Sequence, residues 1–198
     1  MIFFVFNYSN MSRFLTMNPE LHIIMGCMYS GKSTELLKII NHYKILEKSV
    51  CVINHKLDQR YGEDQIVSHD QKSHPCVSVS KLEEVVNLSV FKESNVIVIE
   101  EAQFFENLYK FVVERCIDTH GKTVYVAGLD GDSFQKPFGE ILSLIPYSDS
   151  VTKLSALCVK CKDGTKANFS KRIVSNTDQK LIGSFESFIP VCRYHLKN

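Results

Sequence analysis

The sequence predicts an α/β fold: a mainly parallel sheet with helices on both faces, plus a small metal-binding lobe at the C-terminus. Three observations lead to this prediction. Short apolar runs alternate with helical patterns between residues 21 and 129, which is typical of βαβ units. A glycine-rich loop motif separates the first run from the first helical pattern. Beyond Thr152 the composition shifts to short apolar runs, many lysines and three cysteines, which indicates a boundary.

Composition limits the classes of function open to this chain. Its 198 residues are 44% hydrophobic and 23% charged, as in an ordinary globular protein with one large domain. The net charge of +1 offers no basic surface to nucleic acid or an anionic membrane, and no apolar run reaches the roughly 20 residues of a membrane span. Seven cysteines, an odd number, are typical of intracellular proteins with free or metal-bound thiols. We expect a cytoplasmic protein without nucleic-acid or membrane partners.

The chain divides into three predicted segments. Residues 1–18 contain a short apolar run without a preceding positive charge, followed by Met11 and Met17, so we expect a loose extension or an alternative start rather than a signal peptide. Residues 19–151 carry the alternating pattern and form the predicted α/β domain. Residues 152–198 form the predicted metal-binding lobe.

The first half of the α/β domain has clear element signals. Residues 21–25 form an apolar run that predicts a strand, and residues 34–46 carry apolar side chains at helical spacing. A second buried strand is predicted at residues 50–53. Ser80 and Glu83 have the spacing of a capping box, which predicts a helix from there to about Lys92.

The second half continues the alternation. Residues 96–99 are all β-branched and predict a central strand, because a strand buried on both faces reads as a continuous apolar run. A helix is expected over residues 108–117, ending at His120 and Gly121, since glycine suits the left-handed position after a helix. Residues 123–129 predict the next strand.

The glycine-rich loop fits the pattern G-x-x-x-x-G-K-[ST] between a predicted strand and a predicted helix, which is the context the motif requires. Backbone N–H groups of such a loop wrap phosphates at a helix N-terminus; Lys32 would reach the β- and γ-phosphates and Ser33 would offer a hydroxyl to Mg²⁺. The alternative is a chance match in a glycine turn. The Mg-ATP-binding residues predicted here are Gly26, Cys27, Met28, Tyr29, Ser30, Gly31, Lys32, Ser33 and Thr34.

Two adjacent carboxylates, Glu100 and Glu101, end the central strand. Ligands of open α/β sheets lie at the carboxyl ends of the strands, so the pair should face the phosphate loop. Because neighbouring strand residues point to opposite sides, one carboxylate would serve the metal and the other the nucleophile. A solvated acidic turn is the alternative.

A third group combines Cys158 and Cys161 with Cys192 and His195. Four such ligands in two closely spaced pairs suit tetrahedral zinc, and four protein ligands leave no open position, so a structural site is predicted. A redox pair of cysteines is the rival interpretation, although it does not explain the spacing of His195.

Together these features resemble the type II (cellular and poxvirus-like) thymidine kinases from about Glu20 to the C-terminus. Residues 28–36 are similar to that family's M-F-S-G-K-S-T-E-L, and residues 100–105 to its D-E-A-Q-F-F. Residues 129–139 are similar to its L-D-G-x-F-Q-x-K-P-F-G segment, and residues 170–172 and 191–193 also match.

The resemblance implies roles for individual residues. Glu101 would be the general base. Glu100 stands where the family has the aspartate that helps to hold Mg²⁺, and a glutamate side chain is one methylene longer than that aspartate. Gln103 of the same segment is assigned with Glu100 to the Mg-ATP site. Residues 58–61 resemble the family's D-x-R-Y, which implies that Arg60 stabilises phosphate charge; taken alone, Arg60 would be a surface arginine.

The resemblance also implies a nucleoside pocket and a lasso loop, residues 169–190, that closes over the base. Main-chain groups of the lasso would recognise thymine, with close approach at Gly183. Two departures stand out. Asp132 and Ser133 make the chain one residue longer before Phe134, and Lys136 follows Gln135 with one residue fewer, so the loop keeps its length with a different shape. Phe188 replaces the family's usual tyrosine. The predicted substrate-binding residues are Met28, Phe104, Leu129, Phe134, Phe138, Ser170, Gly183 and Phe188.

The resemblance implies transfer of the γ-phosphate of ATP to the 5′-hydroxyl of thymidine, giving dTMP and ADP for DNA synthesis. It further implies a structural zinc ion, a homotetramer and inhibition by dTTP. Three alternatives stay open: a kinase for another nucleoside, a zinc-ribbon ATPase that binds nucleic acid, and a nucleotide-binding regulatory protein without turnover. The sequence does not decide between thymidine and deoxyuridine.

Overall fold

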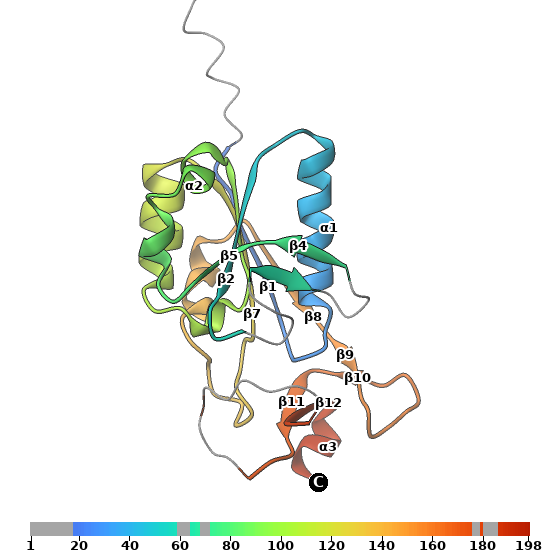
Figure 1. Ribbon diagram of the computed structural model, residues 1–198. Helices are drawn as coiled ribbons and strands as arrows, with labels where there is room; N and C mark the ends of the chain where they lie inside the picture. Colours follow the sequence, from blue (N-terminus) through green and yellow to red (C-terminus); the bar gives the residue numbers. More distant parts are fainter. Residues whose placement is uncertain (1–17, 59–63, 68–71, 176–178, 180–185) are drawn as a thin grey trace, which may run out of the picture.

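The computed structural model describes residues 18–58, 64–67, 72–175, 179 and 186–198, and its centre is a six-stranded sheet (Figure 1). The strand order is β5-β2-β6-β7-β1-β8, and every pairing in the sheet is parallel. The prediction of a mainly parallel sheet is therefore confirmed. Its strands are β1 (Leu21–Gly26), β2 (Val50–His55), β5 (Val77–Val79), β6 (Val96–Ile99), β7 (Thr123–Gly128) and β8 (Ser150–Leu154).

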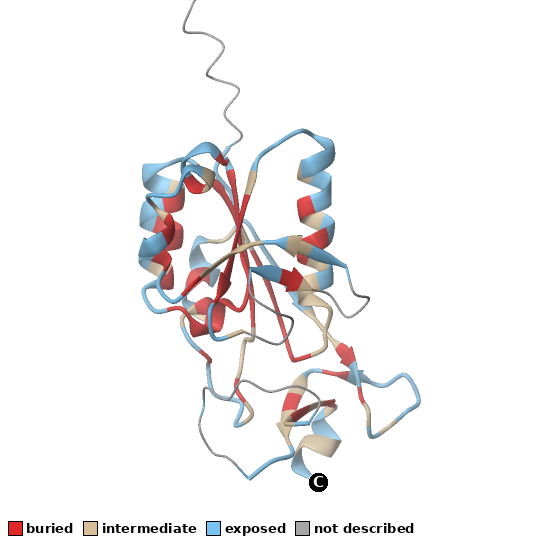
Figure 2. Ribbon diagram, in the orientation of Figure 1, coloured by how far each residue is buried: buried red, intermediate tan, exposed pale blue. Residues whose placement is uncertain are grey.

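Helices cover both faces of this sheet, with α1 on one side and α2 and η4 on the other (Figure 1). Central strand β6 contributes alternately to two cores: Ile97 and Ile99 join one apolar cluster, and Val96 and Val98 join the other. Figure 2 shows this buried layer along the strands. The helical segments are α1 (Lys32–Ile45), η2 (Leu82–Val85), α2 (Ser89–Glu93), η3 (Ala102–Phe104), η4 (Lys110–Thr119) and η5 (Ile141–Tyr147).

The helix expected from Ser80 to about Lys92 forms as two short pieces, η2 and α2. The prediction of one continuous helix was therefore wrong, and so was the residue predicted to cap it. The backbone N–H of Lys81 donates to the Glu84 carboxylate at 2.8 Å, which places the cap one residue later than expected. Burial explains the shift, because Leu82 and Val85 are both fully buried in the core and fix which residues turn inward.

The helix expected near residues 108–117 is present as η4, a π-helical segment. Its start is held by Glu140, whose carboxylate accepts hydrogen bonds from the backbone N–H groups of Asn107 (3.0 Å) and Tyr109 (3.2 Å). Gly121 has φ 59° and follows the segment, so the left-handed termination predicted there is confirmed.

Smaller elements surround the sheet. A hairpin of β3 (Gln65–Val67) and β4 (Ser73–Pro75) precedes β5. After β8 the chain forms two antiparallel pairs and a short final helix, which lie near the end of the sheet that carries the carboxyl termini of its strands (Figure 1). None of the helices in the described part of the chain is long and apolar enough to cross a membrane. The last elements are β9 (Ala156–Leu157), β10 (Lys166–Ala167), β11 (Phe169–Arg172), β12 (Phe188–Val191) and α3 (Arg193–Lys197).

Candidate active site

The glycine-rich loop connects β1 to α1 at the carboxyl end of the sheet. Gly26 has φ 155°, and a Cβ atom there would collide with the carbonyl oxygen of Leu154 in β8, so only glycine fits. The Lys32 ammonium lies over the loop and donates to the carbonyl oxygens of Gly26 (3.3 Å) and Cys27 (3.0 Å). A cation held above a loop at a helix N-terminus is an arrangement that binds phosphate.

Glu100 follows β6 directly and lies against the start of α1. Its backbone N–H donates to the carbonyl oxygen of Ile53 at 2.9 Å, and its carboxylate accepts a hydrogen bond from the Ser33 hydroxyl. The side chain is only 5% exposed. A hydroxyl and a carboxylate at the phosphate loop are the oxygen ligands that Mg²⁺ prefers, so these two residues fit the predicted metal.

Glu101 has a different environment from its neighbour. Its backbone is left-handed (φ 52°), a conformation that is uncommon and strained for a residue other than glycine, and strained residues cluster at functional sites. Its carboxylate accepts a hydrogen bond from the Gln103 amide, whereas the Glu100 carboxylate contacts Ser33. The two carboxylates therefore accept hydrogen bonds from different side chains, and the separate catalytic roles expected for them stay predictions.

The predicted pocket residues form two aromatic groups. Phe104 and Phe138 pack edge to face with ring centroids 5.6 Å apart, and the His55 ring lies 5.7 Å from Phe104. In the second group the Arg172 guanidinium lies over the rings of Phe134 (5.8 Å) and Phe188 (5.1 Å). Leu129 is half-buried directly after β7. Arg60 and Gly183 lie outside the described residues.

Asp132, one of the departures from the family pattern, organises the loop that carries Phe134. One carboxylate oxygen accepts hydrogen bonds from the backbone N–H groups of Phe134 (2.8 Å) and Lys136 (2.9 Å), and the other accepts one from the Gln179 amide (2.7 Å). Neither Asp132 nor His55 was among the predicted site residues. An aspartate two residues before its backbone partner is a turn signal that could have indicated the role of Asp132.

The glycine-rich loop also contacts the C-terminal lobe. The Ser170 hydroxyl accepts a hydrogen bond from the backbone N–H of Met28 at 2.9 Å, and the substrate-binding role predicted for Ser170 stays a prediction. The neighbouring Cys27 thiol donates to the carbonyl oxygen of Ala167 at 3.4 Å. Burial raises the pKa of the Cys27 thiol, which keeps it protonated and able to donate.

We expect Ser170→Ala to lower the free energy of unfolding by about 1–3 kcal/mol, because it leaves the buried N–H of Met28 without an acceptor. Ser170→Thr keeps a hydroxyl and should lose less. Thermal unfolding measures the effect, with Ser155→Ala as the control, since the Ser155 hydroxyl donates its hydrogen bond to the Asn168 side chain at the surface and its loss leaves no buried group unpaired. Equal stability of the Ser170→Ala and wild-type proteins would contradict the argument.

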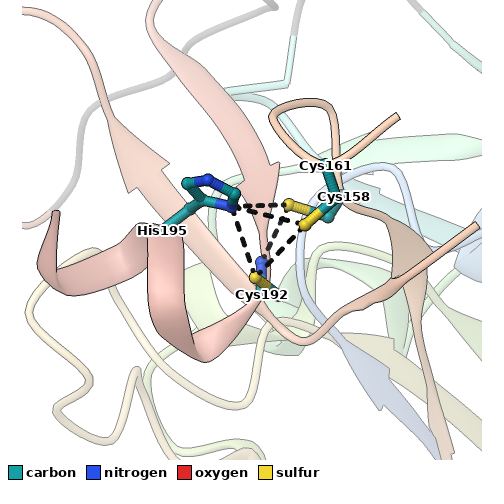
Figure 3. A group of neighbouring side chains, drawn as sticks. All are labelled: Cys158, Cys161, Cys192 and His195. Carbon is teal, nitrogen blue, oxygen red and sulfur yellow. Dashed lines mark hydrogen bonds between the residues drawn. The ribbon is translucent and has the colours of Figure 1, made fainter. Parts of the chain in front are cut away.

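Three cysteines and one histidine meet in the C-terminal lobe (Figure 3). Cys158 and Cys161 come from the connection between β9 and β10, and Cys192 and His195 from the start of α3. The four ligand atoms lie within 4.8 Å of one another. The Nδ1 atom of His195 is 3.4–3.6 Å from each sulfur, and the sulfurs of Cys161 and Cys192 are 3.7 Å apart.

These distances match tetrahedral zinc. Zn–S bonds of about 2.3 Å at tetrahedral angles put two sulfurs about 3.8 Å apart, and a shorter Zn–N bond brings nitrogen slightly closer to sulfur. Burial by itself raises the pKa of the Cys158 thiol, but hydrogen bonds from the backbone N–H groups of Cys192 and Cys161 more than offset it and lower the pKa to about 6. A thiolate is the form that binds metal. Burial and hydrogen bonds to the neighbouring thiols instead raise the pKa of the Cys161 thiol to about 11. The fit to zinc therefore rests on the distances and on the set of three cysteines and one histidine.

Comparison with known proteins identifies the family. The family model described as thymidine kinase matches residues 19–196. Thymidine kinase a of Arabidopsis thaliana is 44% identical over 177 residues, which cover 88% of this chain and 73% of the plant protein. The thymidine kinase of Yaba monkey tumor virus (strain VR587) is 40% identical over 175 residues, covering 87% of this chain and 92% of the viral protein. The thymidine kinase of Myxoma virus (strain Uriarra) is also 40% identical over 175 residues, with coverage of 88% and 94%. By the extent and identity of these matches, the chain belongs to the thymidine kinase family.

Proposed function

We propose that this protein is an ATP-dependent thymidine kinase, which transfers the γ-phosphate of ATP to the 5′-hydroxyl of thymidine and gives dTMP and ADP. The observation that carries the proposal is the family match over residues 19–196. The site geometry supports it, because a phosphate loop, two carboxylates and an aromatic group come together at one edge of the sheet. The product would serve nucleoside salvage for DNA synthesis.

The phosphates of ATP would lie on the loop of residues 26–33. Its backbone N–H groups and the Lys32 ammonium bind the β- and γ-phosphates, and the dipole of α1 adds a favourable field. Ser33 and Glu100 would hold Mg²⁺, which neutralises part of the phosphate charge when bound. Arg60 is proposed, by family resemblance, to stabilise charge on the transferred phosphoryl group.

Glu101 would accept the proton of the 5′-hydroxyl as that oxygen attacks the γ-phosphorus atom. The bond between the γ-phosphorus and the bridging oxygen then breaks, and ADP leaves with the electron pair. Most of the rate enhancement would come from positioning and charge stabilisation, because phosphoryl transfer needs little covalent chemistry from the protein.

The thymine ring and the sugar would bind among Phe104, Phe138, Phe134, Phe188 and Leu129, with Met28 beside the phosphate loop. Aromatic faces stack on a base and exclude water from the reacting groups. Phe188 offers stacking without the hydroxyl of a tyrosine. Recognition of the thymine edge is assigned to main-chain groups of the lasso near Gly183.

Further features of the proposal come from the family resemblance. We infer a structural zinc ion in the cluster of Cys158, Cys161, Cys192 and His195, a homotetramer, inhibition by dTTP and a cytoplasmic location. The end of α1 supports an oligomer, because Ile45 is 78% exposed and Leu46 is 64% exposed there. Contact with another subunit would remove these two side chains from water.

ADP release with Mg-ATP and each deoxynucleoside in turn tests the function. We expect turnover with thymidine and deoxyuridine but none with deoxycytidine or purine deoxynucleosides. Thymine and uracil share a carbonyl group at C4 and a protonated N3, which the lasso would recognise, whereas cytosine has an amino group at C4 and no proton on N3. Turnover with a different nucleoside would retain the phosphate-loop mechanism and overturn the base assignment. Absence of turnover in protein that binds zinc and ATP would favour a regulatory nucleotide-binding protein.

A further inference from the structure

Gln103 is a buried polar side chain beside the proposed base. It lies in η3, two residues after Glu101, and is only 2% exposed. Its Nε2 atom donates a hydrogen bond to the Glu101 carboxylate, and its Oε1 atom accepts one from the backbone N–H of Leu129 at 2.9 Å. Because a backbone N–H can only donate, the Leu129 contact fixes which end of the amide faces Glu101.

The backbone around Gln103 leaves it little room to move. A Cβ atom on Gly128 would lie 2.6 Å from its Oε1 atom, and a Cβ atom on Gly139 would collide with its carbonyl oxygen. Gly128 ends β7 and Gly139 follows the loop that carries Phe138. The glutamine is therefore enclosed by two segments that border the proposed nucleoside pocket.

This arrangement differs from the role expected from the sequence, which grouped Gln103 with the Mg-ATP site. We propose that Gln103 is a positioning residue that holds the Glu101 carboxylate in the orientation for proton transfer and links it to the pocket residue Leu129. The inference rests on the proposed function of Glu101 as the base. Its physical basis is that a catalytic side chain is held in place by hydrogen bonds from groups that are themselves fixed, and Gln103, fixed by Leu129 and enclosed on two sides, donates one such bond to Glu101.

Two substitutions separate the contacts of Gln103. Gln103→Glu keeps an oxygen to accept from Leu129 N–H, but it removes the donor to Glu101 and places two carboxylates together. Gln103→Met keeps the volume and removes both contacts. We expect each to lower kcat by about 10–100-fold, the order of loss caused by misplacing a catalytic group by about 1 Å. KM for ATP and for the nucleoside should change less than about twofold, since neither substrate contacts Gln103 in this proposal.

A double-mutant cycle provides the decisive comparison. In a Glu101→Gln background, Gln103→Met should cause a much smaller further fall in kcat than in the wild-type background, because Gln103 then has no base to position and only its contact with Leu129 is lost. Gln65→Glu and Gln65→Met, at an exposed position in β3, are the matched controls and should retain wild-type kcat. The proposal would be overturned if the two substitutions lowered kcat additively in the double variant, or if Gln103→Met raised KM for Mg-ATP. Either result would favour a direct role of Gln103 in Mg-ATP binding.

The cycle uses whichever deoxynucleoside gives turnover. A wrong thymidine assignment would therefore change only the substrate used, whereas a wrong role for Gln103 would change the outcome of the cycle itself. A spectroscopic measurement covers the case of no turnover. In the ¹⁵N-labelled protein we expect the side-chain amide signals of Gln103 to shift in Glu101→Ala and to stay unchanged in Glu106→Ala, at an exposed position. Unshifted Gln103 signals in Glu101→Ala would contradict the contact itself.

Discussion

Glu101→Gln is expected to lower kcat by about 10²–10⁴-fold, the range typical of a lost general base. Glutamine has the shape of glutamate and can still accept a hydrogen bond from the Gln103 amide, so the local structure should persist. The variant cannot take the proton of the attacking hydroxyl. Affinity for ATP and the zinc content should stay at wild-type values, because the phosphate loop and the cysteine cluster are built from other residues.

Steady-state kinetics, ATP binding and zinc analysis on the same preparations test this expectation. Glu106→Gln is the matched control, since it makes the same substitution at an exposed position five residues later. Near-normal turnover of Glu101→Gln would remove Glu101 as the base. A loss of ATP binding together with turnover would instead assign it to the nucleotide site.

Removal of the metal is expected to have the largest effect on stability. The four ligands join the β9–β10 connection to α3, and α3 has five residues, too few for a stable helix on its own. Apparent binding energies of structural zinc reach about 10–16 kcal/mol, and a loss of only about 4 kcal/mol would lower Tm by about 8–16 °C in a chain of this size. We therefore expect chelation or Cys161→Ser to lower Tm by about 10 °C or more.

Thermal unfolding with and without chelator, together with the zinc content per chain, measures this effect. Cys76→Ser is the matched control, because Cys76 is a half-buried thiol outside the cluster. It should bind one zinc ion per chain and respond to chelator as the wild type does. An unchanged Tm in metal-free protein would show that the lobe folds without the ion.

The parts of the fold that the sequence predicted are those encoded locally. The glycine-rich loop between β1 and α1 was predictable because its glycines, its lysine and both flanking elements lie within about 25 consecutive residues, whereas phosphate binding by this loop stays a prediction. The run Val96–Ile99 was predictable as a central strand because a β-branched run suits burial on both faces. The capping register near Ser80 was missed because burial of Leu82 and Val85 against distant segments decided it.

The same distinction holds for the candidate site. The cysteine cluster was predictable from ligand type and spacing, since zinc chemistry constrains both. The contact between Ser170 and Met28 joins residues 142 positions apart, and that between Gln179 and Asp132 joins residues 47 positions apart. Such contacts depend on how the lobe lies against the sheet, and no local pattern encodes that placement.

Cys27 and Met28 of the glycine-rich loop form hydrogen bonds with the C-terminal lobe, which is synthesised last. Cys27 packs in one apolar cluster with Ala156, Ala167 and Val191, so the loop near the start of the chain is completed by residues near its end. On the ribosome, this loop emerges well before the segment that supports it. A chain that stops early, through a premature stop codon or proteolysis, lacks that support, so nucleotide binding would be acquired only when synthesis is almost finished.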